Sequence, residues 1–424
     1  MKIFDKVALA APDILLPKEG TDLKKWAVVA CDQYTSEPEY WDKVEKFVGD
    51  SPSTLRLILP EVYLETETEE QQGLRLNGIK DSIDSYLANG IWAAPQEGFT
   101  VLSRKTPVNE SRKGLVAAVD LEKYSFEPGN RELIRATEGT VLSRIPPRVK
   151  IRKNAKVELP HIMLLINDSG DTVIGAAYKR AEESGRAPVY DTGLMADSGS
   201  IKGYFIPSSG DEADQIVSAL DKLMKNDPTG MLFAVGDGNH SLASAKAHWE
   251  NVREGLSDEQ RKTHPARFAM AEIVNIHDKG LQFEPIHRIV FDVTPDDLIS
   301  DIKELAGSEN VTVSEDPITE GQIFTIVSEG HSDIFVSVKN PPHMLSVGTV
   351  QMMLDGKKRH VDYIHGEDTV RKLAVNGNTG ILLPDVSKDS FFDTIGTEGV
   401  FPRKTFSMGE AFEKRFYLEA KRID

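Results

Sequence analysis

The stretch LFAVGDGNHSLASAKAHWENV, from Leu232 to Val252, most constrains how this chain can fold. Its apolar run at 231–235 predicts a buried strand, and the residues from 241 to about 255 predict a helix. Another helix is predicted just before the strand, in DEADQIVSALDKLMKNDP, where apolar residues recur at helical spacing. This alternation indicates a fold that mixes helices with strands.

Two β-branched runs in FTVLSRKTPVNESRKGLVAAVDLEKYSF flank a turn segment and predict an antiparallel hairpin. A hairpin disfavours a purely parallel sheet, so we expect a mixed α/β fold of the α+β type with a mixed sheet. The chain has 424 residues, more than one ordinary core accommodates. We expect an N-terminal α+β part at 1–130, a central part at 131–293 that holds the turn, and a C-terminal α/β part at 294–424.

The composition is that of an ordered globular protein, with 40% apolar and 28% charged residues. The formal charge of −17 repels phosphate backbones and anionic membrane surfaces, which disfavours general nucleic-acid and membrane binding. Cys31 is the single cysteine, so an intrachain disulfide and a cysteine metal cluster are both excluded. The first residues do not form a signal-peptide pattern, and we expect a cytoplasmic protein.

The polar turn between strand and helix carries groups that suit a phosphate. Glycine permits close approach of a ligand, and a helix start offers unpaired N–H groups and the positive end of its dipole. Gly238, Asn239 and Ser241 would hold the anion, His240 would donate or move a proton, and Asp237 would hold a metal ion or orient a hydroxyl. The alternative interpretation is that Asp237 or Asn239 simply caps the helix.

A basic stretch at 131–156 stands out in an otherwise acidic chain. It includes Arg144 and Arg148, together with Glu138 and Thr140, which predicts an anion pocket. The alternative is a solvated basic helix face.

Two further segments offer cations and hydroxyls. FEPIHRIV places His287 and Arg288 at the start of a predicted strand, and FPRKTFSMG places Lys404 and Thr405 near the C-terminus. These groups suit an anion, although a surface pair and a plain turn remain the alternatives.

Other chemistries lack support in the sequence. It contains no P-loop, no dinucleotide-binding glycine turn and no zinc-protease helix, and scattered His161, His240, His287 and His365 do not have zinc-ligand spacing. Nothing indicates zinc, haem, flavin or NAD. Cys31 could be a thiolate nucleophile, but a lone cysteine on an apolar run is more often a small buried side chain.

The order of several motifs resembles the DUF1015 family over essentially the full chain. The matching stretches are RLILPEVYL, RATEGTVLSRIPPR, VGDGNHSLASAKA, DKGLQFEPIHRIV, VDYIHG and FPRKTFSMG. The turn is also similar to the phosphate turns of sulfiredoxin and ParB-type proteins, whose relatives include a free-serine kinase. These resemblances imply a ParB/sulfiredoxin-like core and point to serine metabolism.

The chain departs from the family pattern at two positions. Ser241 stands where many members have an arginine, and Thr137 stands where they have a histidine. A phosphate at this turn would then depend on backbone amides and His240, with Arg144 or Arg148 supplying positive charge.

The first functional hypothesis is phosphoryl transfer to or from a small hydroxylated metabolite, with serine or O-phosphoserine as the best guess. Asp237 or Glu138 would hold Mg²⁺ or act as base, His240 or His287 would act as acid, and a nucleotide would be the cosubstrate. The alternative is a regulatory protein that binds a nucleotide or phosphometabolite without turnover. The expected partner is a small anionic metabolite, and the sequence leaves a homo-oligomer open. In either case the ligand-binding residues would be Gly238, Asn239, Ser241, Thr140, Arg144, Arg148, Arg288, Lys404 and Thr405.

Overall fold

The computed structural model describes residues 1–153 and 155–424, without the side chains of Glu65 and Arg144. The chain forms two compact units. Unit 1 comprises Met1–Leu281 and Glu410–Asp424, and unit 2 comprises Gln282–Gly409. Among the described residues, no helix combines the length and the apolar composition that a membrane crossing requires.

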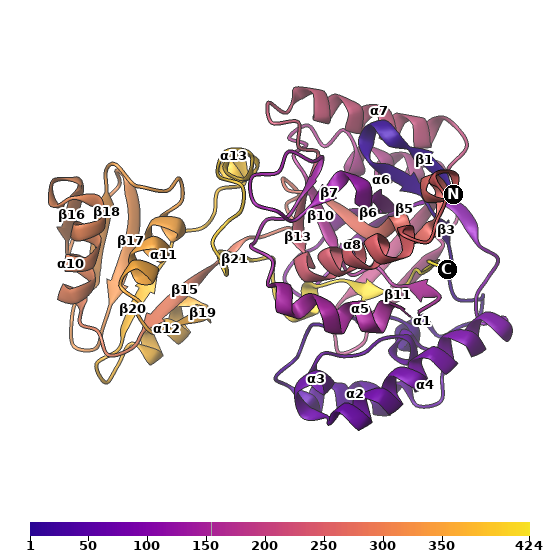
Figure 1. The fold of residues 1–424 in the computed structure, drawn as a ribbon, viewed down its shortest axis with the longest axis horizontal. Helices are drawn as coiled ribbons and strands as arrows, with labels where there is room; N and C mark the ends of the chain where they lie inside the picture. Colours follow the sequence, from indigo (N-terminus) through magenta and orange to yellow (C-terminus); the bar gives the residue numbers. More distant parts are fainter. Residues whose placement is uncertain (154) are drawn as a thin grey trace. The chain divides into compact units, whose positions relative to one another are not determined.

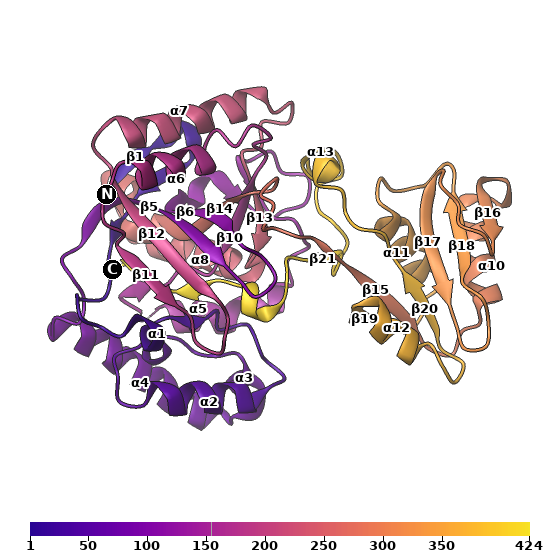
Figure 2. The ribbon, with the colours of Figure 1, turned by 180° about the vertical axis from the view of Figure 1, so that it is seen from behind.

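Unit 1 is built on a 12-stranded sheet (Figure 1, Figure 2). Its strands are β1 (Lys2–Phe4), β2 (Leu9–Ala11), β3 (Asp13–Ile14), β5 (Gln96–Lys105), β6 (Arg112–Asp120), β7 (Tyr124–Ser125), β8 (Ile134–Arg135), β10 (Met163–Ile166), β11 (Tyr190–Gly193), β12 (Ser200–Pro207), β13 (Phe233–Asp237) and β14 (Phe268–Asn275). The main path is β11-β12-β5-β6-β14-β10-β13-β8-β7. Parallel pairs, such as β10 with β14, occur beside antiparallel ones, such as β5 with β6, so the predicted mixed α/β class is confirmed.

Helices cover both faces of this sheet because its central strands bury both sets of alternating side chains. Val101 and Leu115 belong to one apolar cluster, and their neighbours Leu102 and Val116 belong to another. The helices are α1 (Leu23–Trp26), α2 (Pro38–Val48), α3 (Val62–Thr66), α4 (Glu69–Ala88), α5 (Ile145–Lys153), α6 (Ile174–Glu183), α7 (Asp211–Asn226), α8 (Asn239–Arg253) and α9 (Asp258–Thr263). α6, α7 and α8 contribute to the first cluster, and α1, α2 and α4 contribute to the second (Figure 1).

The predicted local elements of unit 1 are confirmed. β5 and β6 form the antiparallel hairpin, with Thr100 opposite Val116, and α7, β13 and α8 follow in the expected order. The expected boundary near residue 130 falls inside this unit, because strands from both sides of it, such as β6 and β14, pair in one sheet.

The last fifteen residues of the chain return to unit 1 and are held there by short pairings and buried charges. β22 (Phe416–Tyr417) pairs with β4 (Val28–Val29), and β23 (Lys421–Arg422) pairs with β9 (Val157–Glu158). Immediately before β22, Arg415 is 1% exposed and donates to Glu272 at 2.7 Å and to Glu419. Both carboxylates are also buried, so each charge of this cluster depends on its partners.

A glycine on β6 makes room for the carboxylate in this cluster. A Cβ at Gly114 would collide with the side chain of Glu272 on the neighbouring strand β14. Glycine is therefore required at position 114, because any side chain there would displace Glu272, the partner of Arg415.

Unit 2 is an antiparallel sheet with helices. Its strands are β15 (Glu284–Val290), β16 (Val311–Ser314), β17 (Gln322–Val327), β18 (Ile334–Val338), β19 (Val361–His365), β20 (Thr379–Leu382) and β21 (Phe406–Ser407), and its helices are α10 (Pro295–Ala306), α11 (Ser346–Gly356), α12 (Glu367–Leu373) and α13 (Lys388–Glu398). The main path is β16-β18-β17-β20-β15-β19, and β21 pairs with β15. The expected boundary near residue 293 falls inside this unit, because β15 pairs with β19 and β20 from beyond it.

The buried arginine predicts a large loss of stability when it is removed. We expect Arg415→Met to lower the free energy of unfolding of unit 1 by about 3–5 kcal/mol, because Glu272 and Glu419 lose their buried partner. Trp26, Trp41, Trp92 and Trp249 are the four tryptophans and all lie in unit 1, so their fluorescence during urea unfolding reports on this unit. The matched control is Arg422→Met, since the exposed pair of Arg422 with Asp424 should contribute less than about 1 kcal/mol. Equal losses of unfolding free energy in the two variants would contradict the conclusion that the buried ion pairs of Arg415 stabilise unit 1.

A second prediction concerns His248 on α8, which is 7% exposed. Burial, and then the charge of Arg152, lowers its pKa from 6.5 to about 4. As the pH falls from 6.5 to 4, the unfolded chain therefore binds a proton that the folded chain does not, and unit 1 should lose on the order of 2–3 kcal/mol. We expect His248→Gln to lose less unfolding free energy than the wild type between pH 6.5 and 4, as measured by urea unfolding. The difference in unfolding free energy between the two proteins at pH 7.5 serves as the reference. Parallel pH profiles of the two proteins would show that His248 does not contribute.

Candidate functional site

The predicted strand, turn and helix join through a glycine in the left-handed region. Gly238 has φ of 83°, and a Cβ there would meet Ile162 at 3.2 Å, so the turn requires glycine. The Leu242 N–H donates to the Gly238 carbonyl at 2.9 Å as the first helical bond. The N–H groups of residues 239–241 therefore precede the regular ladder of α8, and we call residues 238–241 the α8 start.

Neither predicted capping residue caps α8. The Asp237 carboxylate accepts the Gly238 N–H at 2.9 Å and pairs with Lys414 at 3.2 Å. The Asn239 amide exchanges two hydrogen bonds with Thr137, each 3.2 Å long. Neither side chain accepts an N–H group within α8, so the interpretation that Asp237 or Asn239 caps the helix is wrong.

A loop formed by residues 136–141 lies against the α8 start. Thr137 is buried and holds Asn239, and the Val141 N–H donates to Nε2 of His240 at 3.2 Å. This loop carries Glu138 and Thr140, two of the predicted site residues, to the same turn. The Thr140 hydroxyl oxygen is enclosed and has no hydrogen-bond partner in the part of the chain that the structure describes.

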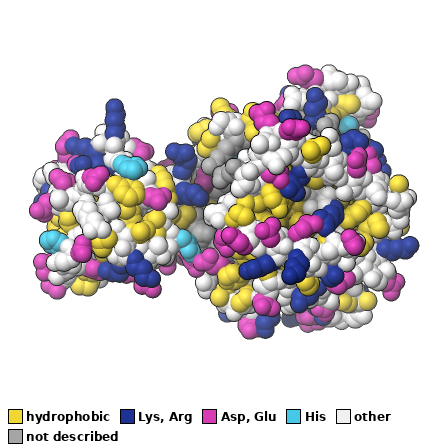
Figure 3. Space-filling model, turned by 90° about the horizontal axis from the view of Figure 1, so that it is seen from below, with side chains coloured by type: hydrophobic (Ala, Val, Ile, Leu, Met, Phe, Trp, Pro, Cys, Tyr) yellow, Lys and Arg dark blue, Asp and Glu magenta, His cyan; other side chains and the backbone are white. Residues whose placement is uncertain are grey.

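The basic stretch is partly neutralised by carboxylates. Arg148 on α5, a helix that packs against α8, forms an ion pair with Glu61. Arg152 pairs with Glu158, and Lys156 pairs with Asp84 at 2.7 Å. Basic and acidic side chains are also interspersed on the face drawn in Figure 3. The side chain of Arg144, another predicted ligand residue, lies outside the described part of the chain.

The structure adds residues that sequence analysis did not connect with the turn. Tyr417 accepts the Cys31 N–H at 3.1 Å and contacts Nδ1 of His161 at 2.9 Å, and Nε2 of His161 lies 2.6 Å from the Ser241 hydroxyl. Lys414, three residues before Tyr417, pairs with Asp237. No local pattern pointed to Tyr417 or Lys414, because they lie more than 170 residues from the turn in sequence.

The pKa values of two half-buried carboxyl groups near these hydrogen bonds, Asp32 and Glu61, are shifted in opposite directions. Burial raises the pKa of Asp32, but electrostatic interactions with His161, the hydrogen bond from Gln33 and the charge of Lys414 outweigh it, so the net pKa lies below its ordinary value. Asp32 is therefore ionised at neutral pH. Burial raises the pKa of Glu61, against the opposing effect of its partner Arg148.

The remaining predicted residues belong to unit 2. Arg288 is fully buried, burial lowers its pKa to about 10, and it donates to the carbonyls of Ile286 at 2.6 Å and Lys404 at 3.1 Å. His287 is also buried, which lowers its pKa, and its Nδ1 accepts the Leu383 N–H at 3.1 Å. The interpretation of these two residues as a surface pair is therefore wrong.

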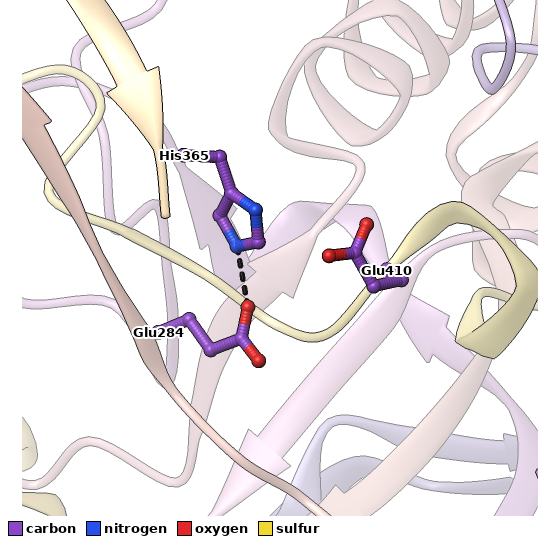
Figure 4. Close-up of side chains that lie close together, drawn as sticks. All are labelled: Glu284, His365 and Glu410. Carbon is purple, nitrogen blue, oxygen red and sulfur yellow. Dashed lines mark ion pairs between the residues drawn. The ribbon is translucent and has the colours of Figure 1, made fainter. Parts of the chain in front are cut away.

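Lys404 and Thr405 lie in the segment that Arg288 holds. Lys404 is exposed with φ of 57°, and Thr405 is buried and donates its hydroxyl to the Pro402 carbonyl at 2.6 Å. On β19 of the same unit, His365 forms an ion pair with Glu284 of β15 (Figure 4). A ligand-binding role for His287, Arg288, Lys404 and Thr405 stays a prediction.

The environment of Cys31 predicts an inert thiol. Burial, followed by the charges of Asp32 and Glu61, raises its pKa to about 12. At pH 8 we expect iodoacetamide to alkylate the folded protein at least about 100-fold more slowly than the urea-unfolded chain, with no plateau in rate below pH 10. Cys31 is the single cysteine, so mass spectrometry measures the rate directly. Rapid alkylation of the folded protein at pH 8 would instead support the thiolate nucleophile.

Comparisons with known proteins give a family and distant likenesses of fold. No curated protein matches the chain. Similar solved structures include a free serine kinase in complex with AMP (11% identity, TM-score 0.36, covering 73% of this chain and 92% of that chain), SbnI with a C-terminal truncation from Staphylococcus aureus (9%, 0.39, 72% and 87%) and a conserved hypothetical protein from Pyrococcus furiosus (12%, 0.33, 73% and 95%). The likeness of the turn to those of sulfiredoxin and ParB-type proteins stays a prediction. Residues 15–368 match the family described as protein of unknown function (DUF1015), and the chain therefore belongs to this family, as its motifs predicted.

Proposed function

We propose that unit 1 transfers a phosphoryl group to or from a small hydroxylated metabolite at the α8 start, with serine and O-phosphoserine as the first substrates to test. The observation that carries this proposal is that the two candidate caps of the helix start, Asp237 and Asn239, bind Lys414 and Thr137 instead. A helix start whose N–H groups are left without a side-chain cap suits an oxyanion.

The surrounding loop supports an anion at this place. Residues 136–141 are bound to the turn through Asn239 and His240, which holds the enclosed Thr140 hydroxyl beside the α8 start. An enclosed hydroxyl without a partner costs free energy unless a ligand satisfies it. We assign Thr140 as a ligand donor. His240 would orient the loop, since its Nε2 already accepts the Val141 N–H.

Asp32 is the best candidate for the base. It is half-buried and ionised, and it interacts electrostatically with His161, whose ring contacts Ser241 of the α8 start. An ionised carboxylate can accept the proton of the attacking hydroxyl as the phosphoryl group is transferred. Asp32 replaces Asp237 in this role, because both Asp237 oxygens already have partners.

A nucleotide would serve as phosphoryl donor, and Mg²⁺ would neutralise charge on its phosphates. Mg²⁺ in such sites takes one or two carboxylates together with phosphate oxygens. Asp237 does not fit this donor set, because its carboxylate is bound to Lys414 and the Gly238 N–H. Glu138 on the adjacent loop is the proposed ligand, which leaves Asp32 as the base.

The existing ion pairs of two cations near the α8 start, Lys414 and Arg148, favour a second function, which is ligand binding without turnover. Lys414 and Arg148 already pair with Asp237 and Glu61, so transfer would require them to exchange partners as charge develops. A regulatory protein that binds a phosphometabolite or nucleotide without turnover needs no such exchange.

The assay measures O-phosphoserine formed from serine, Mg²⁺ and ATP or ADP, and phosphate released from O-phosphoserine. If Asp32 accepts the proton, we expect Asp32→Asn to lower kcat by about 100-fold or more, with a smaller change in KM. The matched control is Glu39→Gln, an exposed carboxylate in the first turn of α2, which should retain full activity. Thermal stabilisation by O-phosphoserine or nucleotide without any turnover would contradict the enzyme and support the regulatory protein.

A further inference from the structure

We infer that Ser241 donates its hydroxyl hydrogen to a phosphate oxygen at the α8 start, and that Tyr417 and His161 are positioning residues that enforce this direction. This inference rests on the proposed function, because it concerns the anion at the same helix start. It assigns a part in recognition to Tyr417, which lies more than 170 residues from the turn in sequence.

Four groups form a series of hydrogen bonds, namely the Cys31 N–H, Tyr417, His161 and Ser241. The direction of this series is fixed at its first member, a backbone N–H that can only donate. The Cys31 N–H donates to the Tyr417 hydroxyl oxygen at 3.1 Å. Tyr417 is 1% exposed, so its own hydrogen needs an acceptor within the protein. Nδ1 of His161, 2.9 Å away, is that acceptor.

The hydrogen bond at Nδ1 of His161 determines the direction of the hydrogen bond between Nε2 and Ser241 of α8. An imidazole whose Nδ1 accepts a hydrogen bond carries its hydrogen on Nε2. Nε2 lies 2.6 Å from the Ser241 hydroxyl, so Ser241 accepts from His161. Among the described residues the Ser241 hydroxyl has no second partner, and its hydrogen is left for a ligand that accepts.

Two other arrangements of the hydrogens compete with this direction. The Cys31 sulfur also interacts with the Tyr417 hydroxyl, but a thiol is a much weaker acceptor than an imidazole nitrogen. A doubly protonated His161 would still donate from Nε2 to Ser241. Only a neutral His161 with its hydrogen on Nδ1 reverses the direction of these hydrogen bonds. Ser241 would then donate to His161, and its oxygen would act as an acceptor for the ligand.

The direction determines what Ser241 can bind. A hydroxyl that must donate favours an anionic oxygen and disfavours an ammonium group at the same place. Ser241 lies in the first turn of α8, where the helix dipole favours negative charge as well. Both effects select the phosphate oxygens of a metabolite rather than its amine.

Nitrogen NMR on ¹⁵N-histidine-labelled full-length protein tests the direction without any ligand. The His161 signals are identified by their loss in His161→Gln. We expect hydrogen on Nε2 in the wild type, and in Tyr417→Phe a shift of the population toward hydrogen on Nδ1, because Nδ1 loses its donor. The control is Tyr86→Phe, which removes a hydroxyl that also accepts a backbone N–H, from Ser53 at 3.0 Å. A neutral wild-type His161 with hydrogen on Nδ1 would overturn the inference.

Calorimetric titration with inorganic phosphate tests the contact. We expect Ser241→Ala to bind phosphate about 10-fold more weakly, and Ser241→Thr to stay within about 3-fold of the wild type, since threonine restores the hydroxyl. The control is Ser244→Ala, which removes a hydroxyl bonded within α8 to the His240 carbonyl at 2.7 Å. Equal phosphate binding by the wild type and Ser241→Ala overturns the inference alone. A wild type that binds no phosphate, O-phosphoserine or nucleotide overturns the proposed function together with it.

Discussion

The buried pairing of Arg415 with Glu272 and Glu419 is the interaction on which the candidate site depends. It holds the C-terminal segment to β14 of the central sheet, and Lys414 and Tyr417 flank the arginine in that segment. A buried charge without its partners is costly, so the segment has one strongly preferred position. Lys414 reaches Asp237 and Tyr417 reaches His161 because of that position.

The described charged side chains around the α8 start interact largely with one another. Asp237 and Glu61 are each paired with a cation, and Asp32 is ionised under the influence of His161 and Lys414. Because these cations are already paired, recognition of the proposed anion would depend on oriented donors, the N–H groups of the helix start and the hydroxyls of Ser241 and Thr140. An acidic protein can bind phosphate locally in this way.

Unit 2 uses a buried arginine for a different purpose. Arg288 donates to backbone carbonyls on its own strand and on the segment that contains Lys404, and its guanidinium lies 4.5 Å from the Tyr363 ring centroid. The guanidinium therefore adds to the backbone hydrogen bond from the Ile286 N–H to the Thr405 carbonyl, which already joins β15 to the segment leading to β21. In the His-Arg motif that the sequence suggested as an anion site, Arg288 donates to backbone carbonyls and His287 accepts a backbone N–H.

The sequence by itself determined the local elements of the site and the family. The periodicity of residues 211–253 predicted α7, β13 and α8, and the ordered motifs predicted the family. Only the tertiary structure decided that Asp237 and Asn239 do not cap the helix, and that Tyr417, Lys414 and Asp32 belong with the turn. Periodicity and turn chemistry depend on neighbours within a few residues, whereas these contacts join segments more than 100 residues apart. They depend on the buried ion pairs and sheet pairings that bring the segments together.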